Sequence, residues 1–128
     1  MTTLETRLEI KSWDEKPYRE LPDGTKFNRA EVVLAGADVE GTFEALLYYR
    51  ADGTSTYVTL MTLTGTLAGR TGSVVLAGEG SYDGTTARGE SRVIDATGEL
   101  AGLTGTATSE STHADYPHMP LVLTYHIG

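Results

Sequence analysis

The fold is decided by the stretch Asp52-Gly-Thr-Ser-Thr-Tyr-Val-Thr-Leu-Met-Thr-Leu-Thr-Gly-Thr-Leu-Ala-Gly69, in which one strand-like run lies between two turn sequences. Asp-Gly between such runs is a strong hairpin signal, because glycine accepts a positive φ without steric cost. The run between the turns is rich in Thr, Val and Leu, which suit a pleated surface. The stretch therefore predicts a strand over residues 55–67 with a turn at each end.

Both turn sequences recur along the chain. Asp-Gly-Thr begins at positions 23, 52 and 83, and Leu-Ala-Gly begins at 67 and 100. Two further breaks lie at Gly36–Asp38 and in the proline-bearing stretch His113–Pro120. In an up-and-down meander, successive turns fall at opposite ends of the sheet. All three Asp-Gly-Thr turns are thus expected at one end and both Leu-Ala-Gly turns at the other.

These breaks predict strands at 3–13, 26–36, 39–50, 55–67, 70–82, 86–96, 103–112 and 119–127. Alternation is clearest in the first strand, where Leu4, Leu8 and Ile10 share one face with Thr6. A flat sheet of this size would leave two long edges, which closure removes. The predicted fold class is all-β, a single eight-stranded antiparallel up-and-down barrel over residues 1–128. Such a barrel is either filled by side chains or holds one small ligand.

Composition narrows the classes of function. The chain has 128 residues, a formal charge of −8 and a pI near 4.7, so its field repels phosphate backbones and anionic lipids. We therefore expect no nucleic-acid partner and no membrane partner. There is no Cys, which excludes thiolate metal sites and thiol catalysis. With charges in its first ten residues and no apolar run of about 20 residues, the chain is expected to be cytoplasmic.

Several phrases resemble those of a known family. They are Lys11-Ser-Trp-Asp-Glu-Lys-Pro-Tyr18, Tyr49-Arg-Ala-Asp-Gly-Thr-Ser-Thr-Tyr57, Gly65-Thr-Leu-Ala-Gly-Arg-Thr-Gly-Ser73, Gly98-Glu-Leu-Ala-Gly-Leu-Thr-Gly105 and His113-Ala-Asp-Tyr116. The family is the bacterial domain-of-unknown-function family 3224, whose fold resembles the calycin-like allene oxide cyclase barrel. The resemblance implies an interior cavity for an apolar or polyketide-like molecule, permits a cyclase or isomerase, and makes a homodimer possible. It implies no catalytic residue.

The strand at 39–50 has two possible registers. Either Phe43, Ala45, Leu47 and Tyr49 face inward, or the alternate set that contains Glu44 does, because a one-residue slip exchanges the two faces. The apolar set is favoured. If Glu44 points inward instead, desolvation would raise the pKa of its carboxyl, and it is then the candidate general acid or base for an isomerisation.

Aromatic side chains are the candidate ligand contacts, because each combines a large apolar body with a polar tip. They are Trp13, Tyr18, Tyr48, Tyr49 and Tyr57. The same residues could simply fill a small barrel. The segment from Trp13 to Tyr18 is predicted to fold over the barrel mouth as a lid or plug.

Charged residues supply two further candidates. Arg92, two residues from Glu90, is predicted to lie beside Glu44 as part of an orienting ion pair, the alternative being a surface pair worth little. The loop that contains His113, Asp115 and His118 has imidazole and carboxylate groups that zinc or nickel accept. Its spacing matches no established metal motif, so the prediction is no metal and no cofactor.

Three functions remain open. The favoured one is a small-molecule-binding barrel whose apolar pocket is lined by Tyr. The first alternative is an isomerase or cyclase that holds a flexible substrate inside the barrel. The second is a filled, non-catalytic scaffold that works by self-association. A cavity of a few hundred Å³ distinguishes the first two from the third.

Overall fold

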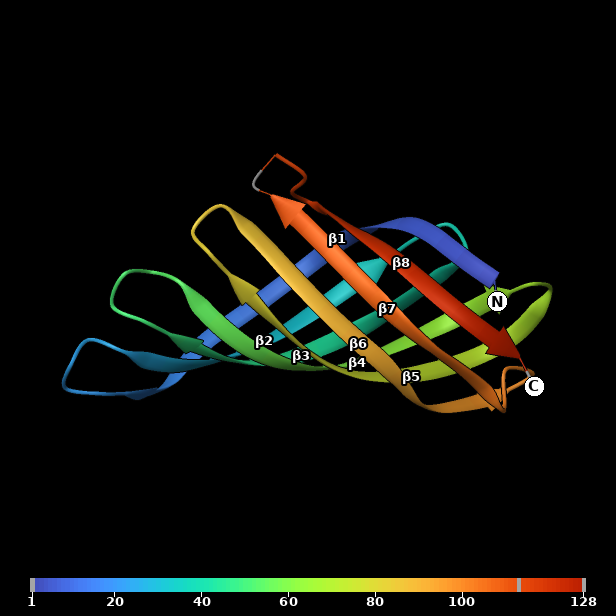
Figure 1. The fold of residues 1–128 in the computed structure, drawn as a ribbon, viewed down its shortest axis with the longest axis horizontal. Coiled ribbons are helices and arrows are strands. Elements are labelled where there is room, and N and C mark those ends of the chain that lie inside the picture. Colours follow the sequence, from blue (N-terminus) through green and yellow to red (C-terminus); the bar gives the residue numbers. More distant parts are fainter. Residues whose placement is uncertain (1, 113, 128) are drawn as a thin grey trace.

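The computed structural model describes residues 2–112 and 114–127 and shows eight antiparallel strands that form one closed barrel (Figure 1). The strands are β1 (Thr2–Glu20), β2 (Lys26–Ala35), β3 (Val39–Tyr49), β4 (Ser55–Leu67), β5 (Arg70–Tyr82), β6 (Thr86–Gly98), β7 (Leu103–Thr112) and β8 (His118–Ile127). Each strand pairs with the next, and residues 2–9 of β1 pair with β8 to complete the ring. The all-β, antiparallel prediction is confirmed. The residues described include no helix long and apolar enough to cross a membrane.

The turns are distributed as the sequence predicts. The β1–β2, β3–β4 and β5–β6 turns carry Asp-Gly-Thr and lie at one end with the β7–β8 connection, which we call the D-G-T end (Figure 1). The opposite end, which we call the L-A-G end, carries the other turns, the beginning of β1 and the end of β8.

The three Asp-Gly-Thr turns share one hydrogen-bond pattern. In the β3–β4 turn, Gly53 has a φ of 88°, and the Asp52 carboxylate accepts hydrogen bonds from the Thr54 hydroxyl at 2.7 Å and the Thr54 amide at 2.9 Å. These bonds lower the pKa of Asp52 by stabilising its charged form.

Strand β1 is longer than predicted. The sequence predicts a strand that ends at residue 13 and a lid that follows it, but β1 continues to Glu20, and its part from Glu9 to Glu20 pairs with β2 with two register shifts. The segment from Trp13 to Tyr18 is therefore a barrel wall, which corrects the prediction of a lid. Pairing with β8 stops at Glu9, so the rest of β1 has one open edge, and an edge tolerates Pro17, which lacks an N–H group.

The interior is packed with leucine at the L-A-G end. Leu67 and Leu100, both from Leu-Ala-Gly turns, are buried and close this end. Between them and the middle of the barrel lie fully buried side chains, namely Leu8, Leu34, Leu63, Val74, Leu76 and Leu123. In β3, Phe43, Ala45 and Leu47 are buried, so the favoured register is confirmed.

Candidate functional site

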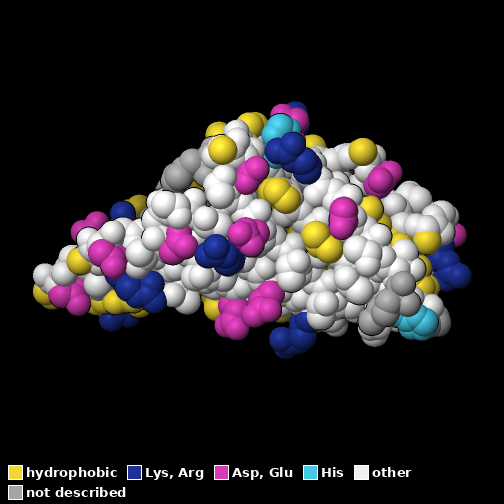
Figure 2. Space-filling view, turned by 45° about the horizontal axis from the view of Figure 1, so that its top comes forward, with side chains coloured by type: hydrophobic (Ala, Val, Ile, Leu, Met, Phe, Trp, Pro, Cys, Tyr) yellow, Lys and Arg dark blue, Asp and Glu magenta, His cyan; other side chains and the backbone are white. Residues whose placement is uncertain are grey.

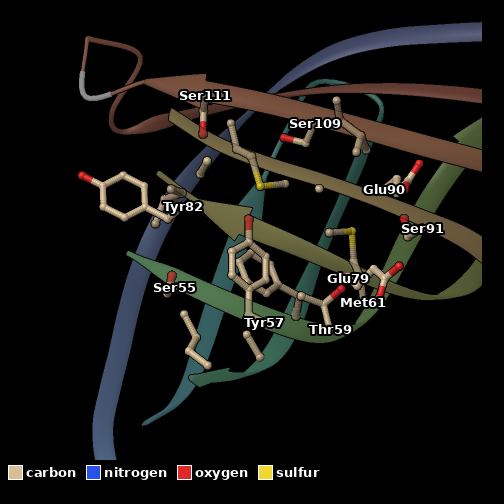
Figure 3. Close-up of a pocket in the computed structure, with 18 of the residues that line it drawn as sticks. Ser55, Tyr57, Thr59, Met61, Glu79, Tyr82, Glu90, Ser91, Ser109 and Ser111 are labelled. Atoms are coloured by element: carbon tan, nitrogen blue, oxygen red, sulfur yellow. The ribbon is translucent and has the colours of Figure 1, made fainter. Parts of the chain in front are cut away.

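A cavity of about 720 Å³ occupies the interior at the D-G-T end (Figure 3). This is within the range of roughly 300–1,000 Å³ that small-molecule sites span. Its apolar wall includes Ile10, Trp13, Phe43, Leu47, Met61 and Leu121. Hydroxyl groups interrupt that wall, from Tyr49, Ser55, Tyr57, Thr59, Ser91, Ser109 and Ser111.

Small side chains keep this half of the interior empty. Strands β6 and β7 line the cavity with Ala87, Gly89, Ser91, Ala107 and Ser109. Toward the other end of the barrel, the same inward-facing pattern carries larger side chains, Val93 on β6 and Leu103 on β7. Because the side chains that line the cavity from β6 and β7 stop one or two atoms from the backbone, the centre at the D-G-T end is not filled.

Gly80 makes room for the ring of Tyr57. The two residues are partners in the β4–β5 ladder, and a Cβ atom on Gly80 would lie 2.5 Å from the Tyr57 ring. The ring therefore lies against the bare backbone of β5 and β6, and its hydroxyl donates to the Arg88 carbonyl at 3.3 Å. Burial raises the pKa of Tyr57.

The mouth is widened where β7 and β8 separate. Their ladder ends at the pair Thr108 and Val122, and beyond it the Ser109 hydroxyl donates to the Pro120 carbonyl at 2.6 Å. From this point β7 follows β6 while β8 follows β1. The cavity can therefore be reached from the D-G-T end.

A carboxylate with three neutral donors lies behind the cavity wall. Glu15 accepts hydrogen bonds from the Tyr49 hydroxyl at 3.0 Å, the Asn28 amide at 2.6 Å and the Trp13 indole at 3.0 Å. Among the described residues, no cationic side chain forms a salt bridge with Glu15. The charge is thus compensated by hydrogen bonds, two of them from residues that line the cavity.

Two of the groups that donate to Glu15, Tyr49 and Asn28, have unusual properties of their own. Burial, and then the adjacent Glu15 charge, raise the pKa of Tyr49 to about 12, so its hydroxyl stays protonated at neutral pH. The amide oxygen Oδ1 of Asn28 is buried and has no partner among the described residues. A buried acceptor without a partner is costly, which suggests a donor from outside the chain.

The aromatic predictions divide into two groups. Trp13, Tyr49 and Tyr57 line the cavity as expected. Tyr48 is on the outer face of β3, where its ring packs 5.2 Å from that of Phe27, because strand alternation turns it away from Tyr49. Tyr18 is 56% exposed at a shift in the β1–β2 register. Tyr48 and Tyr18 are therefore not lining residues.

The two charged candidates are both outside the barrel. Glu44 is exposed and pairs with Arg29 at 2.9 Å, so the alternative register, in which Glu44 would act inside the barrel as a general acid or base, is wrong. The cause is the confirmed β3 register, which turns Phe43 and Ala45 inward. Arg92 is also exposed on the outer face of β6, where it is the ladder partner of Ala77, and it does not line the cavity.

The loop between β7 and β8 is held by one of its own residues. Asp115 accepts hydrogen bonds from the Thr112 amide at 2.8 Å and the Thr112 hydroxyl at 3.2 Å, which lower the pKa of Asp115. His118 lines the cavity, and His113 lies outside the described residues. Within residues 2–112 and 114–127, no group of three or more His, Asp or Glu side chains could hold a metal ion.

Sequence reasoning missed Glu15. A shift in register after Ile10 leaves Lys11 unpaired with β2 and reverses the alternation, so that Trp13 and Glu15 face inward. The signal available in the sequence was the pair of opposite charges two residues apart, Asp14 and Lys16, which is typical of an outer strand face. In the structure these side chains form an exposed pair at 3.8 Å. An outer face at 14 and 16 places residues 13 and 15 inside.

The outer wall near the cavity is polar. A second hollow lies over β5, β6 and β7, where Glu79 and Glu90 are cross-strand partners and Arg88 pairs with Glu110 at 3.6 Å. Figure 2 shows acidic and basic side chains scattered over one face, with hydrophobic ones in separate spots. The interior cavity is therefore the better candidate for an apolar ligand.

The fold and the cavity together define a small all-β barrel that is packed at one end and hollow at the other. A family model described as protein of unknown function (DUF3224) matches residues 5–123, and the chain belongs to that family. The structure is similar to the crystal structure of a protein with unknown function from the DUF3224 family of Shewanella oneidensis MR-1. The TM-score is 0.78 at 22% identity, over 100% of this chain and 98% of that one. No curated protein matches.

Proposed function

We propose that this protein binds a small, largely apolar molecule inside the barrel at the D-G-T end. The observation that carries the proposal is the cavity of about 720 Å³ bordered by Trp13, Phe43, Met61 and Tyr57. A barrel that served only as a scaffold would gain stability from filling this space, as leucine fills the other end. The small side chains of β6 and β7 are what a binding site requires.

A second candidate function is an isomerase or cyclase in a barrel of the allene oxide cyclase type. The interior carboxylate of Glu15 favours it over a purely passive site. Glu15 is one hydrogen bond from the cavity through Tyr49, at 3.0 Å. A proton could pass between a bound substrate and Glu15 through this hydroxyl, while the cavity holds the substrate in a reactive conformation.

The experiment fills the cavity from inside. In the Ser91→Phe variant, a ring is added to the lining of β6, and in the matched control Arg92→Phe the same ring is added one residue along on the outer face. The probes are a naphthol and its methyl ether, titrated by calorimetry. We expect Ser91→Phe to weaken both by at least about tenfold, because they would compete with the new ring for space, and Arg92→Phe to leave both unchanged. Equal affinity in all three proteins would place binding outside the cavity and overturn the proposal.

A further inference from the structure

Four aromatic donors around the cavity are committed to acceptors of the protein. The Trp13 indole and the Tyr49 hydroxyl donate to Glu15, at 3.0 Å each, and the Tyr82 hydroxyl donates to the Gly84 carbonyl at 2.8 Å. Tyr57 donates to the Arg88 carbonyl. Figure 3 shows Tyr82 at the edge of the lining with its hydroxyl directed away from the other labelled side chains.

A hydroxyl that donates its hydrogen bond to a carboxylate has only its lone pairs left for another partner. At Tyr49 this commitment is strong, because a hydrogen bond to a charged acceptor is shorter and stronger than one to a neutral acceptor. Tyr49 therefore presents the cavity with an acceptor. The Ser and Thr hydroxyls of the lining serve in either role and set no preference.

The lack of a Lys or Arg side chain in the cavity acts in the same direction. None is among the described residues that line it, and the two acidic residues at its border, Glu79 and Glu90, are exposed on the outer face of β5 and β6. Lys26 has its ammonium group 5.4 Å from the centre of the Tyr49 ring, but it is not among the lining residues. An anionic ligand would lose its hydration without gaining an ion pair.

Glu15 and Asn28 add two acceptors behind Tyr49. Three donors occupy Glu15, which leaves capacity for one more, and Oδ1 of the 4% exposed Asn28 has no partner. The inner wall of β1, β2 and β3 thus has acceptors in excess of donors.

From this excess we infer that the cavity selects neutral or cationic ligands whose polar end donates a hydrogen bond, such as a phenol, an alcohol or an amine, and disfavours carboxylates. The inference rests on the proposed function and names the chemistry of its ligand. Tyr49 receives the donor of the ligand, and Glu15 is a positioning residue that fixes the direction of the Tyr49 hydroxyl.

The test is a set of four probes that share one ring system: a naphthol, its methyl ether, a naphthoate and a naphthylmethylamine. Calorimetric titration of the full chain at neutral pH measures each affinity. We expect the naphthol and the amine to bind about tenfold more tightly than the ether, the difference that one hydrogen bond supplies, and the naphthoate to bind most weakly.

The outcomes separate this inference from the proposed function. If the ether or the naphthoate binds as tightly as the naphthol, the inference is overturned while the proposed function stands. If none of the four binds, both fail.

The Glu15→Gln variant tests the positioning role. The Gln amide keeps one neutral acceptor oxygen and replaces the other with an NH2 donor, so Trp13, Asn28 and Tyr49 compete for a single, weaker acceptor. The hold on the Tyr49 hydroxyl is thereby weakened, and the ratio of naphthol to ether affinity is expected to fall. The matched control is Tyr48→Phe, which removes a hydroxyl from the outer face of the same strand and should leave the ratio unchanged. An unchanged ratio in folded Glu15→Gln would overturn the role of Glu15. If that variant does not fold, the four wild-type affinities alone decide the inference.

Discussion

The two ends of the barrel are made from the same strands with the same inward alternation, yet one is solid and the other hollow. At the L-A-G end the inward positions carry leucine and valine, and Leu67 and Leu100 close the barrel from its turns. At the D-G-T end they carry glycine, alanine and serine on β5, β6 and β7. Side-chain size along a constant pattern thus determines where the ligand space lies.

The boundary between the two ends falls within a single ladder pair. Met61 of β4 and Leu76 of β5 are partners, but Leu76 is fully buried while Met61 is half-buried and lines the cavity. The packed end supplies the stability that permits the other end to remain open.

The largest expected effect comes from truncating one member of this pair. Leu76→Ala should lower the free energy of unfolding by about 2–5 kcal/mol, because it leaves a void in close-packed surroundings. Met61→Ala should cost less than half as much, since its side chain already borders open space. Urea unfolding of both variants measures the difference. Equal losses would show that the two ends are packed alike and would remove the contrast.

A smaller effect on folding stability is expected at alkaline pH, where Tyr49 at the hollow end loses its proton. The pKa of Tyr49 is raised to about 12 in the folded protein, against about 10 for an unperturbed tyrosine. The folded state therefore holds this proton more tightly than the unfolded state. Its contribution to stability is fully present below pH 10 and is lost as the pH rises from about 10 to about 12.

Tyr49→Phe should flatten that alkaline loss, and Tyr48→Phe should not, since Tyr48 lies on the outer face. Thermal unfolding at a series of alkaline pH values compares the three proteins. If stability falls equally with rising pH in wild type and Tyr49→Phe, burial and Glu15 do not raise the pKa of Tyr49.

Much of the fold could be predicted from local signals. The Asp-Gly-Thr turns require a residue with positive φ and a side chain that accepts from the residue two positions on, and both requirements are visible in the sequence at Gly53 and Asp52. Alternation predicted the β3 register and hence Tyr49 inside. Trp13 and Tyr57 were predicted as ligand contacts because they are aromatic, not from alternation, and both are in the lining.

The parts that could not be predicted depend on pairing between distant residues. The reversal of alternation after Ile10 arises where β1 loses β8 as a partner and continues against β2 alone. Without that knowledge Glu15 looks like part of a charged loop, and Glu44 looks like the better carboxylate. The contact of Tyr57 with Gly80 likewise needs the β4–β5 register, which neither strand reveals alone.

The most direct test of the central claim is a residue-by-residue NMR titration of the isotopically labelled protein with the naphthol. The account predicts that amide shifts change around the D-G-T cavity, at Tyr49, Tyr57, Ser91 and Ser109, and remain constant at Leu76, Leu100 and Leu123. Shift changes confined to the outer face of β3 and β6, or centred on the leucines of the L-A-G end, would contradict it.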